Sequence, residues 1–167
     1  MHGNLLLISP QCSATGDVDP DGCGGLWLLE ESSDYNDLVL KHYDHRGVKE
    51  ITPFRFPIGS TEVYACDRSD CVFVYHQPDG CSDHDGRLTY IYKNREPGGG
   101  WRWADRVIRE NNCPTDTKFV SNGDGELWAL MMDLENDIKF WKCSSTEMRP
   151  LPFSYPLAFN SAELIEG

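Results

Sequence analysis

The sequence predicts an all-β fold built from propeller-like blades, because a short phrase recurs at an interval of about 50 residues. It reads Asn-Asp-Leu at 36–38, Gly-Arg-Leu at 86–88 and Asn-Asp-Ile at 136–138. Each copy ends a polar turn with a residue that tolerates positive φ and then begins an apolar, strand-like run. About four short runs of this kind fall within one interval, which is the sequence signature of a β-propeller blade.

Length and charge limit the other classes of protein. The 167 residues suit a single domain with a sizeable core. Twenty-seven acidic residues against 15 basic ones give a net charge of −12, which argues against a phosphate-binding surface and hence against a nucleic-acid partner. No apolar run approaches the roughly 20 residues of a membrane span, so we expect no membrane partner either.

The first predicted blade covers approximately residues 4–58. Its strands are expected where apolar and β-branched residues cluster between turn residues, and Pro53 and Pro57 are expected to end the pattern. The four predicted strands are 4–11, 25–30, 38–43 and 48–52.

The second predicted blade covers approximately residues 59–113. Its last element follows a glycine run and is rich in Trp, Val and Ile, a composition that favours a strand over a helix. The four predicted strands are 61–66, 71–76, 88–93 and 101–108.

The third predicted blade covers approximately residues 114–155, and a closing strand is expected at 156–165. Its register is supported by Leu-Trp at 127–128, which stands two intervals after Leu-Trp at 26–27. Asp124-Gly125 is expected to form a tight turn before that strand. The three strands predicted inside this blade are 117–121, 127–132 and 138–143.

Regular strand spacing would also fit a β-sandwich or a barrel, which we keep as the alternative fold. A propeller usually has 4 to 8 blades, so three blades do not close a ring. Either the chain is a piece of a larger protein, or identical chains form a homo-oligomer that completes the ring.

Seven cysteines are many for a chain of this length, and their spacing matches no zinc pattern. We predict disulfides, and therefore a secreted or extracellular protein whose signal peptide is absent from this chain. The alternative is that the cysteines are reduced, buried thiols. The candidate pairs are Cys12 with Cys23, Cys66 with Cys71, and Cys81 with Cys113, which leaves Cys143 odd.

Asp17, Asp19 and Asp21 alternate along the chain and precede Gly22, as in a calcium-binding loop. Hard oxygen ligands at alternate positions can converge on one Ca²⁺ ion. The twelfth position of such a loop would be Leu28, which offers no carboxylate. A plain acidic surface loop is therefore the alternative.

No catalytic residues are predicted. The sequence lacks the Gly-x-Ser-x-Gly, His-Glu-x-x-His and phosphate-loop motifs. His42, Asp44 and His45 lie close together in sequence and could form a metal or general-base site, but a solvated strand end is favoured.

Three segments of the second blade, at 71–77, 87–92 and 98–103, resemble the six-bladed fucose-binding lectins of fungi and bacteria. The resemblance implies a propeller fold, and some short members of that family assemble their ring from several chains. The sugar-binding Arg and Glu of the family correspond here to Phe73 and Tyr90. The resemblance therefore concerns the fold rather than fucose binding.

The best candidate for ligand binding is the aromatic and basic segment that follows the glycine run. An aromatic ring can stack on the apolar face of a sugar while charged groups hydrogen-bond to its hydroxyls. The alternative is that the tryptophans pack between blades. The candidate residues are Trp101, Arg102, Trp103 and Arg106, with Tyr90 and Tyr92 on the preceding strand.

We therefore predict a secreted, lectin-like carbohydrate-binding module with a glycan as its ligand. One alternative is a non-catalytic protein-interaction or scaffold fragment of a larger propeller protein, with a protein ligand. A propeller resembling glycoside hydrolases is the other, and it would require paired carboxylates that face one cleft.

Overall fold

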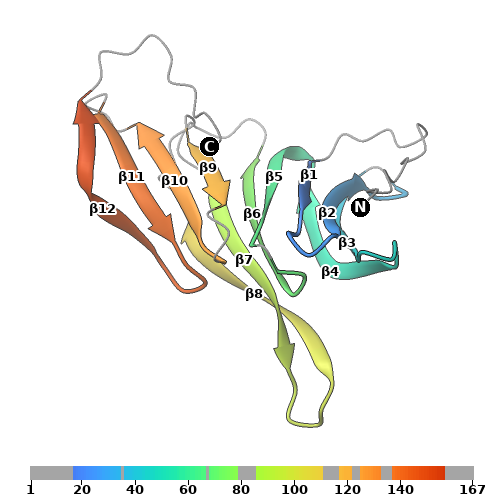
Figure 1. Cartoon of the computed structure of the whole chain (residues 1–167). Helices are drawn as coiled ribbons and strands as arrows, with labels where there is room; N and C mark the ends of the chain where they lie inside the picture. The colour runs from blue at the N-terminus through green and yellow to red at the C-terminus, as the bar shows by residue number, and fades with distance from the viewer. Residues whose placement is uncertain are drawn as a thin grey trace, which may run out of the picture.

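The computed structural model describes residues 17–34, 36–66, 68–78, 86–110, 117–121, 125–132 and 137–156. These residues form strands and no helix, and the strands make three four-stranded antiparallel sheets (Figure 1). The predicted all-β fold with three blades of four strands is thereby confirmed. No helix within the described ranges is long and apolar enough to span a membrane.

Each sheet is built from four strands that follow one another in the chain. The first sheet contains β1 (Val18–Pro20), β2 (Leu26–Glu31), β3 (Asp37–Tyr43) and β4 (Lys49–Pro57). The second contains β5 (Gly59–Ala65), β6 (Cys71–Pro78), β7 (Arg87–Arg95) and β8 (Trp101–Glu110). The third contains β9 (Lys118–Ser121), β10 (Leu127–Met132), β11 (Asp137–Cys143) and β12 (Met148–Pro156).

The three sheets lie side by side in chain order, with β5 in contact with both β1 and β9 (Figure 1). Alternate residues of β6 enter two different cores. Val72 and Val74 face the first sheet, whereas Phe73 and Tyr75 face the third. The middle sheet is therefore buried on both faces, which explains why β6 is almost continuously apolar.

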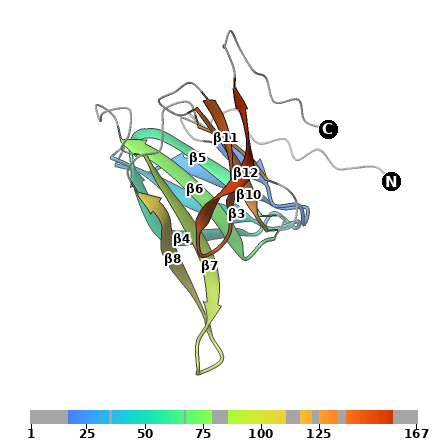
Figure 2. The ribbon, with the colours of Figure 1, turned by 90° about the vertical axis from the view of Figure 1, so that its left-hand side faces the viewer.

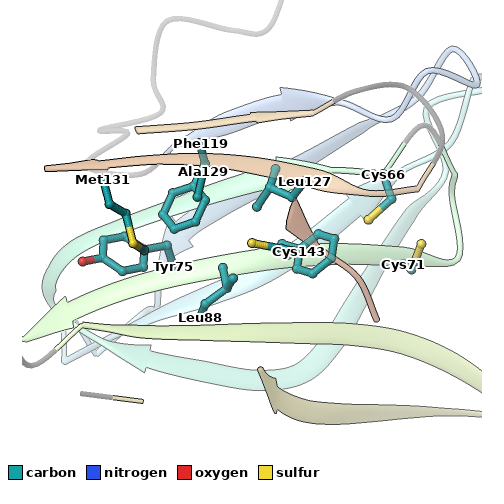
Figure 3. Close-up of a cluster of buried hydrophobic side chains, with 10 residues drawn as sticks. Cys66, Cys71, Tyr75, Leu88, Phe119, Leu127, Ala129, Met131 and Cys143 are labelled. Carbon is teal, nitrogen blue, oxygen red and sulfur yellow. The ribbon is translucent and has the colours of Figure 1, made fainter. Parts of the chain in front are cut away.

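Each junction between sheets has its own hydrophobic core. At the first junction, Trp27, Leu29, Leu38 and Leu40 pack against Val63, Ala65, Val72, Val74 and Ile91. At the second, Phe73, Tyr75 and Leu88 pack against Phe119, Leu127, Ala129 and Met131 (Figure 3). Full burial of one such aliphatic side chain stabilises the fold by about 1.5–3 kcal/mol.

Two carboxylates join the first sheet to the second at their inner strands. Asp17 Oδ2 accepts a hydrogen bond from Val63 N at 2.9 Å, and Asp19 Oδ2 accepts one from Ala65 N at 2.6 Å. These N–H groups belong to β5, the edge strand of its sheet. The aspartates satisfy edge donors that have no strand partner.

The first strand of the first sheet differs from the prediction. The predicted strand at 4–11 lies outside the described residues, and the inner position is taken by β1, which pairs with β2. The segment interpreted as a calcium loop therefore contains a strand. Its aspartates alternate because a strand places every second side chain on the same face.

Pro53 does not end the outer strand β4, so this part of the prediction was wrong, whereas Pro57 is the last residue of β4. The register of β3 with β4 shifts between Val39 and Lys41, which places Pro53 at an irregularity of the ladder. There Thr52 Oγ1 donates a hydrogen bond to Leu40 O at 2.9 Å, in a place where proline has no N–H to offer.

A similar register shift occurs two intervals later, beside β12, a strand that the sequence did not predict. β11 and β12 shift register between Lys139 and Trp141, and β12 carries Pro150 and Pro152. β12 is an outer edge strand, where a missing N–H is tolerated. The fourth strand of the third blade is thus Met148–Pro156, and most of the predicted closing strand at 156–165 lies outside the described residues.

Gly86 is required for a reason other than the predicted positive φ. Positive φ occurs at Gly47 and Gly125, at 76° and 75°, whereas Gly86 is not among the positive-φ glycines. A Cβ atom at Gly86 would collide with the ring and hydroxyl of Tyr75. Close approach of an aromatic side chain explains this glycine.

The described cysteines are thiols, so the predicted pairing of Cys66 with Cys71 is not found. Cys23, Cys66, Cys71 and Cys143 are not part of a disulfide, while Cys12, Cys81 and Cys113 lie outside the described residues. Cys66 and Cys71 are buried and hydrogen-bond to each other, and this contact together with burial raises the pKa of the Cys66 thiol. The argument for secretion gains no support from these four thiols.

We expect Asp19→Ala to lower the free energy of unfolding by about 1.5–3 kcal/mol, because the part-buried N–H of Ala65 loses a charged acceptor. Urea unfolding in EDTA measures this loss without a contribution from divalent cations. The exposed Asp105→Ala serves as control. A variant as stable as the wild type would contradict the proposed junction.

We expect iodoacetamide to alkylate the exposed Cys23 in the native protein and to spare Cys66, Cys71 and Cys143 until the chain is unfolded. Peptide mapping by mass spectrometry under non-reducing conditions gives the result. Recovery of a peptide with a Cys66–Cys71 disulfide would contradict the structure.

Candidate functional site

The hairpin formed by β7 and β8 projects beyond the rest of the molecule (Figures 1 and 2). The pairing of β7 with β6 ends at Tyr92, so the hairpin beyond this residue has no neighbouring strand on that side. Its turn is closed by a hydrogen bond from Glu96 N to Gly100 O at 2.9 Å. The hairpin tip is therefore accessible to a ligand.

Strand alternation divides the six predicted binding residues between two faces of this hairpin. Lys93 pairs with Trp103, and the next residue of the same face on β8 is Trp101. Tyr90 and Arg106 form a pair on the opposite face. Tyr92 and Arg102 also belong to that opposite face by their positions in the strands.

One face carries a cluster of Glu50, Lys93 and Trp103, which we name the Glu50 cluster. Trp103 Nε1 donates a hydrogen bond to Glu50 Oε1 at 3.0 Å, and Lys93 Nζ donates to Glu50 Oε2 at 2.5 Å. The Lys93 ammonium also lies 4.9 Å from the centroid of the Trp103 ring. A carboxylate, an ammonium and an indole thus meet where the first sheet adjoins the second.

Trp101 extends this cluster into solvent. Its side chain is 65% exposed, the most exposed of the large hydrophobic residues described. It lies two residues before Trp103 on the same face of β8. An exposed indole beside charged hydrogen-bonding groups is suited to stacking on an apolar ring face of a ligand.

A buried pair of polar side chains, Asp21 and His42, lies next to the Glu50 cluster in the first sheet. His42 Nε2 donates to Asp21 Oδ2 at 2.8 Å, and Asp21 Oδ1 accepts hydrogen bonds from Cys23 N at 2.8 Å and Gly25 N at 2.7 Å. His42 is paired with Glu50 across the β3–β4 ladder. The pair therefore connects the core of the first sheet to the strand that presents Glu50.

The electrostatic balance at Asp21 favours the carboxylate. Burial opposes ionisation, but the hydrogen bonds from His42 and from the two backbone N–H groups outweigh it and hold the pKa of Asp21 below its usual value. The predicted interpretation of His42 as part of a solvated strand end was wrong, because His42 is 4% exposed.

An indole links the buried pair to the Glu50 cluster. The Trp27 ring lies 4.5 Å from the His42 ring and 5.6 Å from the Trp103 ring, measured between centroids. The contact with Trp103 is edge to face, a favourable geometry for aromatic pairs. Trp27 is fully buried, so it holds Trp103 in place rather than contacting a ligand.

The opposite face of the hairpin is used for packing. The rings of Tyr90 and Tyr92 stack with their centroids 5.3 Å apart, and the centroids of the Tyr90 and Phe73 rings are 5.0 Å apart. Burial, together with the hydrogen bond to Cys71, raises the pKa of Tyr90. Arg106 Nη1 donates a hydrogen bond to Ser145 O at 3.2 Å, in the turn between β11 and β12. The structure thus separates these residues from Trp101 and Trp103.

The second junction does not repeat the Glu50 cluster. In the third sheet, the position of Lys93 is occupied by Cys143, 50 residues later. Lys93 pairs with Trp103 across its ladder, whereas Cys143 pairs with Met148. In the second sheet, the position of His42 is occupied by Tyr92. His42 pairs with Glu50 across its ladder, whereas Tyr92 pairs with Ala104. The polar cluster is therefore a specific feature of the first junction and not of the repeat.

Glu50 and Lys93 were missed by sequence reasoning. Both lie in predicted strands, where a charged residue is ordinarily assigned to a solvated face. Their departure from the residues at matching positions, Ala104 and Cys143, is the signal that could have singled them out. Only the packing of one sheet on another brings them together.

The three aspartates proposed for calcium have different protein partners. Asp17 and Asp19 bind N–H groups of β5, and Asp21 binds His42. Within the described part of the chain, no group of three or more His, Cys, Asp or Glu side chains is placed to hold a metal ion. Calcium binding stays a prediction without geometric support from these contacts.

The Asp44 carboxylate is also engaged by groups of its own turn. Its carboxylate accepts hydrogen bonds from Val48 N at 2.9 Å and Arg46 N at 2.8 Å, and it pairs with the Arg46 guanidinium. The bonds from Val48 and then Arg46 lower the pKa of Asp44 to about 2. These contacts close the turn between β3 and β4.

Comparison with protein-family models, curated proteins and solved structures found no match for this chain. The class of protein is therefore defined by the fold and the site alone. It is an all-β, propeller-like chain that presents an indole and a charged cluster at one junction between sheets.

The lowered pKa of Asp21 predicts a pH-dependent stability. The stabilisation is complete above about pH 5 and is lost as the pH falls past the ordinary value of 3.8 toward the lower folded-state pKa. We therefore expect the difference in free energy of unfolding between wild type and Asp21→Asn to be largest near neutral pH and to shrink in acid. Urea unfolding across this pH range measures it, and a constant difference would contradict the assignment.

Proposed function

We propose that this protein is a non-catalytic carbohydrate-binding module that binds its ligand at Trp101 and the Glu50 cluster. The observation that carries the proposal is the 65% exposed Trp101 indole beside a carboxylate and an ammonium that are fixed by their partners. An indole stacks on the apolar face of a pyranose, and the charged groups bind its hydroxyls.

The arrangement also favours binding because it is preorganised. Glu50 accepts from both Lys93 and Trp103, and Trp103 is held by the buried Trp27. Each group therefore loses little conformational freedom when a ligand arrives. The side chains of Lys93 and Glu50 remain 25% and 40% exposed, so both can exchange water for ligand hydroxyls.

A protein-interaction module is the second candidate. It is favoured by Trp128, which is 40% exposed on the third sheet, far along the chain from the Glu50 cluster. That surface is mainly apolar, with Lys118 in the wall of its hollow and the Lys142–Glu126 ion pair beside Trp128. It suits a protein partner better than a sugar.

An array of immobilised glycans tests the carbohydrate proposal, followed by calorimetric titration with the glycan that binds best. We expect Trp101→Ala and Glu50→Gln each to weaken binding at least about tenfold, which corresponds to about 1.4 kcal/mol. Val107→Ala, an exposed substitution farther along β8, is the matched control and should leave affinity unchanged. Each variant is first compared with the wild type by thermal unfolding.

Two results would overturn the proposal. One is a folded wild-type protein that binds nothing on the array. The other is a glycan whose affinity is the same for the wild type, Trp101→Ala and Glu50→Gln.

A further inference from the structure

Among the three sheets that the described residues form, the first and the third each have one face that neither of the other two covers. On the first sheet this face carries Val18, Leu26 and Leu28, the residues that alternate with the buried Trp27 and Leu29. It also carries Val39 and the ion pair of Lys41 with Glu30. On the third sheet it carries Val120, Trp128, Leu130 and Phe140. We name these the first-sheet face and the third-sheet face.

The repeat shows which face of the first sheet corresponds to the third-sheet face. Trp27 pairs with His42 and Trp128 pairs with Lys142, two intervals later, so the two indoles occupy the same position in their sheets. Trp27 is 0% exposed because the second sheet covers it, whereas Trp128 is 40% exposed. The third-sheet face thus has the residues of a junction without the sheet that would complete it.

The adjacent positions follow the same correspondence. Leu29 pairs with Leu40, and both are fully buried at the first junction. Their counterparts Leu130 and Phe140 also form a pair, and both are only partly buried. Val120 lies beside Trp128 on β9 and is 39% exposed. Several neighbouring apolar side chains of this face are therefore exposed in part, although Ile138 on the same face is 4% exposed.

The order of the sheets makes the two faces the two halves of one further junction. At each internal junction, the face that carries Trp27 or Phe73 packs on the opposite kind of face of the next sheet in the chain. Trp27 meets Val72 and Val74, and Phe73 and Tyr75 lie in one core with Leu127 and Ala129. The third-sheet face is of the kind that carries Trp27 and Phe73. The first-sheet face is of the kind that carries Val72 and Val74, and it places the Lys41–Glu30 ion pair among its aliphatic residues.

The third-sheet face is also hollowed. A cavity of about 210 Å³ opens on it, and its walls are almost entirely apolar. Such a hollow is large enough to receive an aliphatic side chain from a facing sheet. It is lined by Lys118, Val120, Ser121, Trp128, Ala129, Leu130 and Phe140.

We propose that the third-sheet face packs on the first-sheet face of a second copy of this chain, and that the reciprocal contact closes a ring of two chains. The contact continues the two junctions already present within the chain. It joins two different faces, so it is heterologous and must close on itself to give a finite assembly.

The number of copies follows from the number of sheets. Two chains of three sheets give six, which lies within the usual range of about 4 to 8 blades, whereas three chains would give nine. This assembly does not rest on carbohydrate binding, because the Glu50 cluster lies at an internal junction.

Light scattering after size-exclusion chromatography of the full chain tests the proposal. We expect the wild type to have twice the chain mass of 18.9 kDa and Trp128→Glu to have the mass of one chain. Trp101→Glu changes an indole that is even more exposed but lies outside both faces, and it should retain the mass of two chains. Circular dichroism shows whether each variant keeps its β structure.

A mixing experiment tests whether the contact is heterologous. Val18 is 51% exposed on the first-sheet face, and Val18→Glu should also have the mass of one chain. A mixture of Trp128→Glu with Val18→Glu retains one intact pair of faces and should form a species of two chains. Two copies of the same variant retain no intact pair of faces, so each variant alone should have the mass of one chain.

Three results would overturn the proposal. A folded wild type with the mass of one chain would remove the second copy as the occupant of this face. A closed assembly of another size would refute the ring of two. A folded Trp128→Glu variant that keeps the wild-type mass would exclude the third-sheet face from the contact.

Discussion

The face-to-face packing of the second sheet on both of its neighbours is the constraint on which the rest of the structure depends. A strand places alternate side chains on opposite faces, so β6 supplies Val72 and Val74 to one core and Phe73 and Tyr75 to the other. A shift of one residue would exchange the two sets, which differ greatly in size. The register of this strand therefore determines the fit at both junctions, and with it the positions of the outer strands that carry the candidate site.

The candidate site depends on the first junction in the same way. Glu50 belongs to the first sheet, and Lys93 and Trp103 belong to the second, so their hydrogen bonds exist only when the two sheets are packed. Trp27 fills the core below them and contacts both Trp103 and His42. The buried Asp21–His42 pair then sets where β3, and hence Glu50 on the adjoining strand, lies. Stability and ligand geometry are consequently coupled at this junction, whereas the second junction uses its matching positions for packing alone.

The repeat has consequences beyond the fold. A chain of similar sheets that each pack on the next ends in two unlike faces. The irregularity opposite Leu40 recurs opposite Phe140, so the likeness of the first and third sheets extends to the outer strands. The open face around Trp128 therefore resembles the faces that form the internal junctions, which is the basis for proposing a second copy of the same chain as its partner.

The sequence by itself determined the class of the fold, the interval of the repeat and most strands, because alternating apolar residues and turn residues are local signals. It also identified the hairpin with Trp101 and Trp103. It could not show that Pro53, Pro150 and Pro152 are accommodated in edge strands, since that depends on which strand lacks a neighbour. Only the tertiary structure brought Glu50 to Lys93 and Trp103, and buried His42 against Asp21. These outcomes depend on contacts between residues about 20 to 50 positions apart, and no local pattern encodes such contacts.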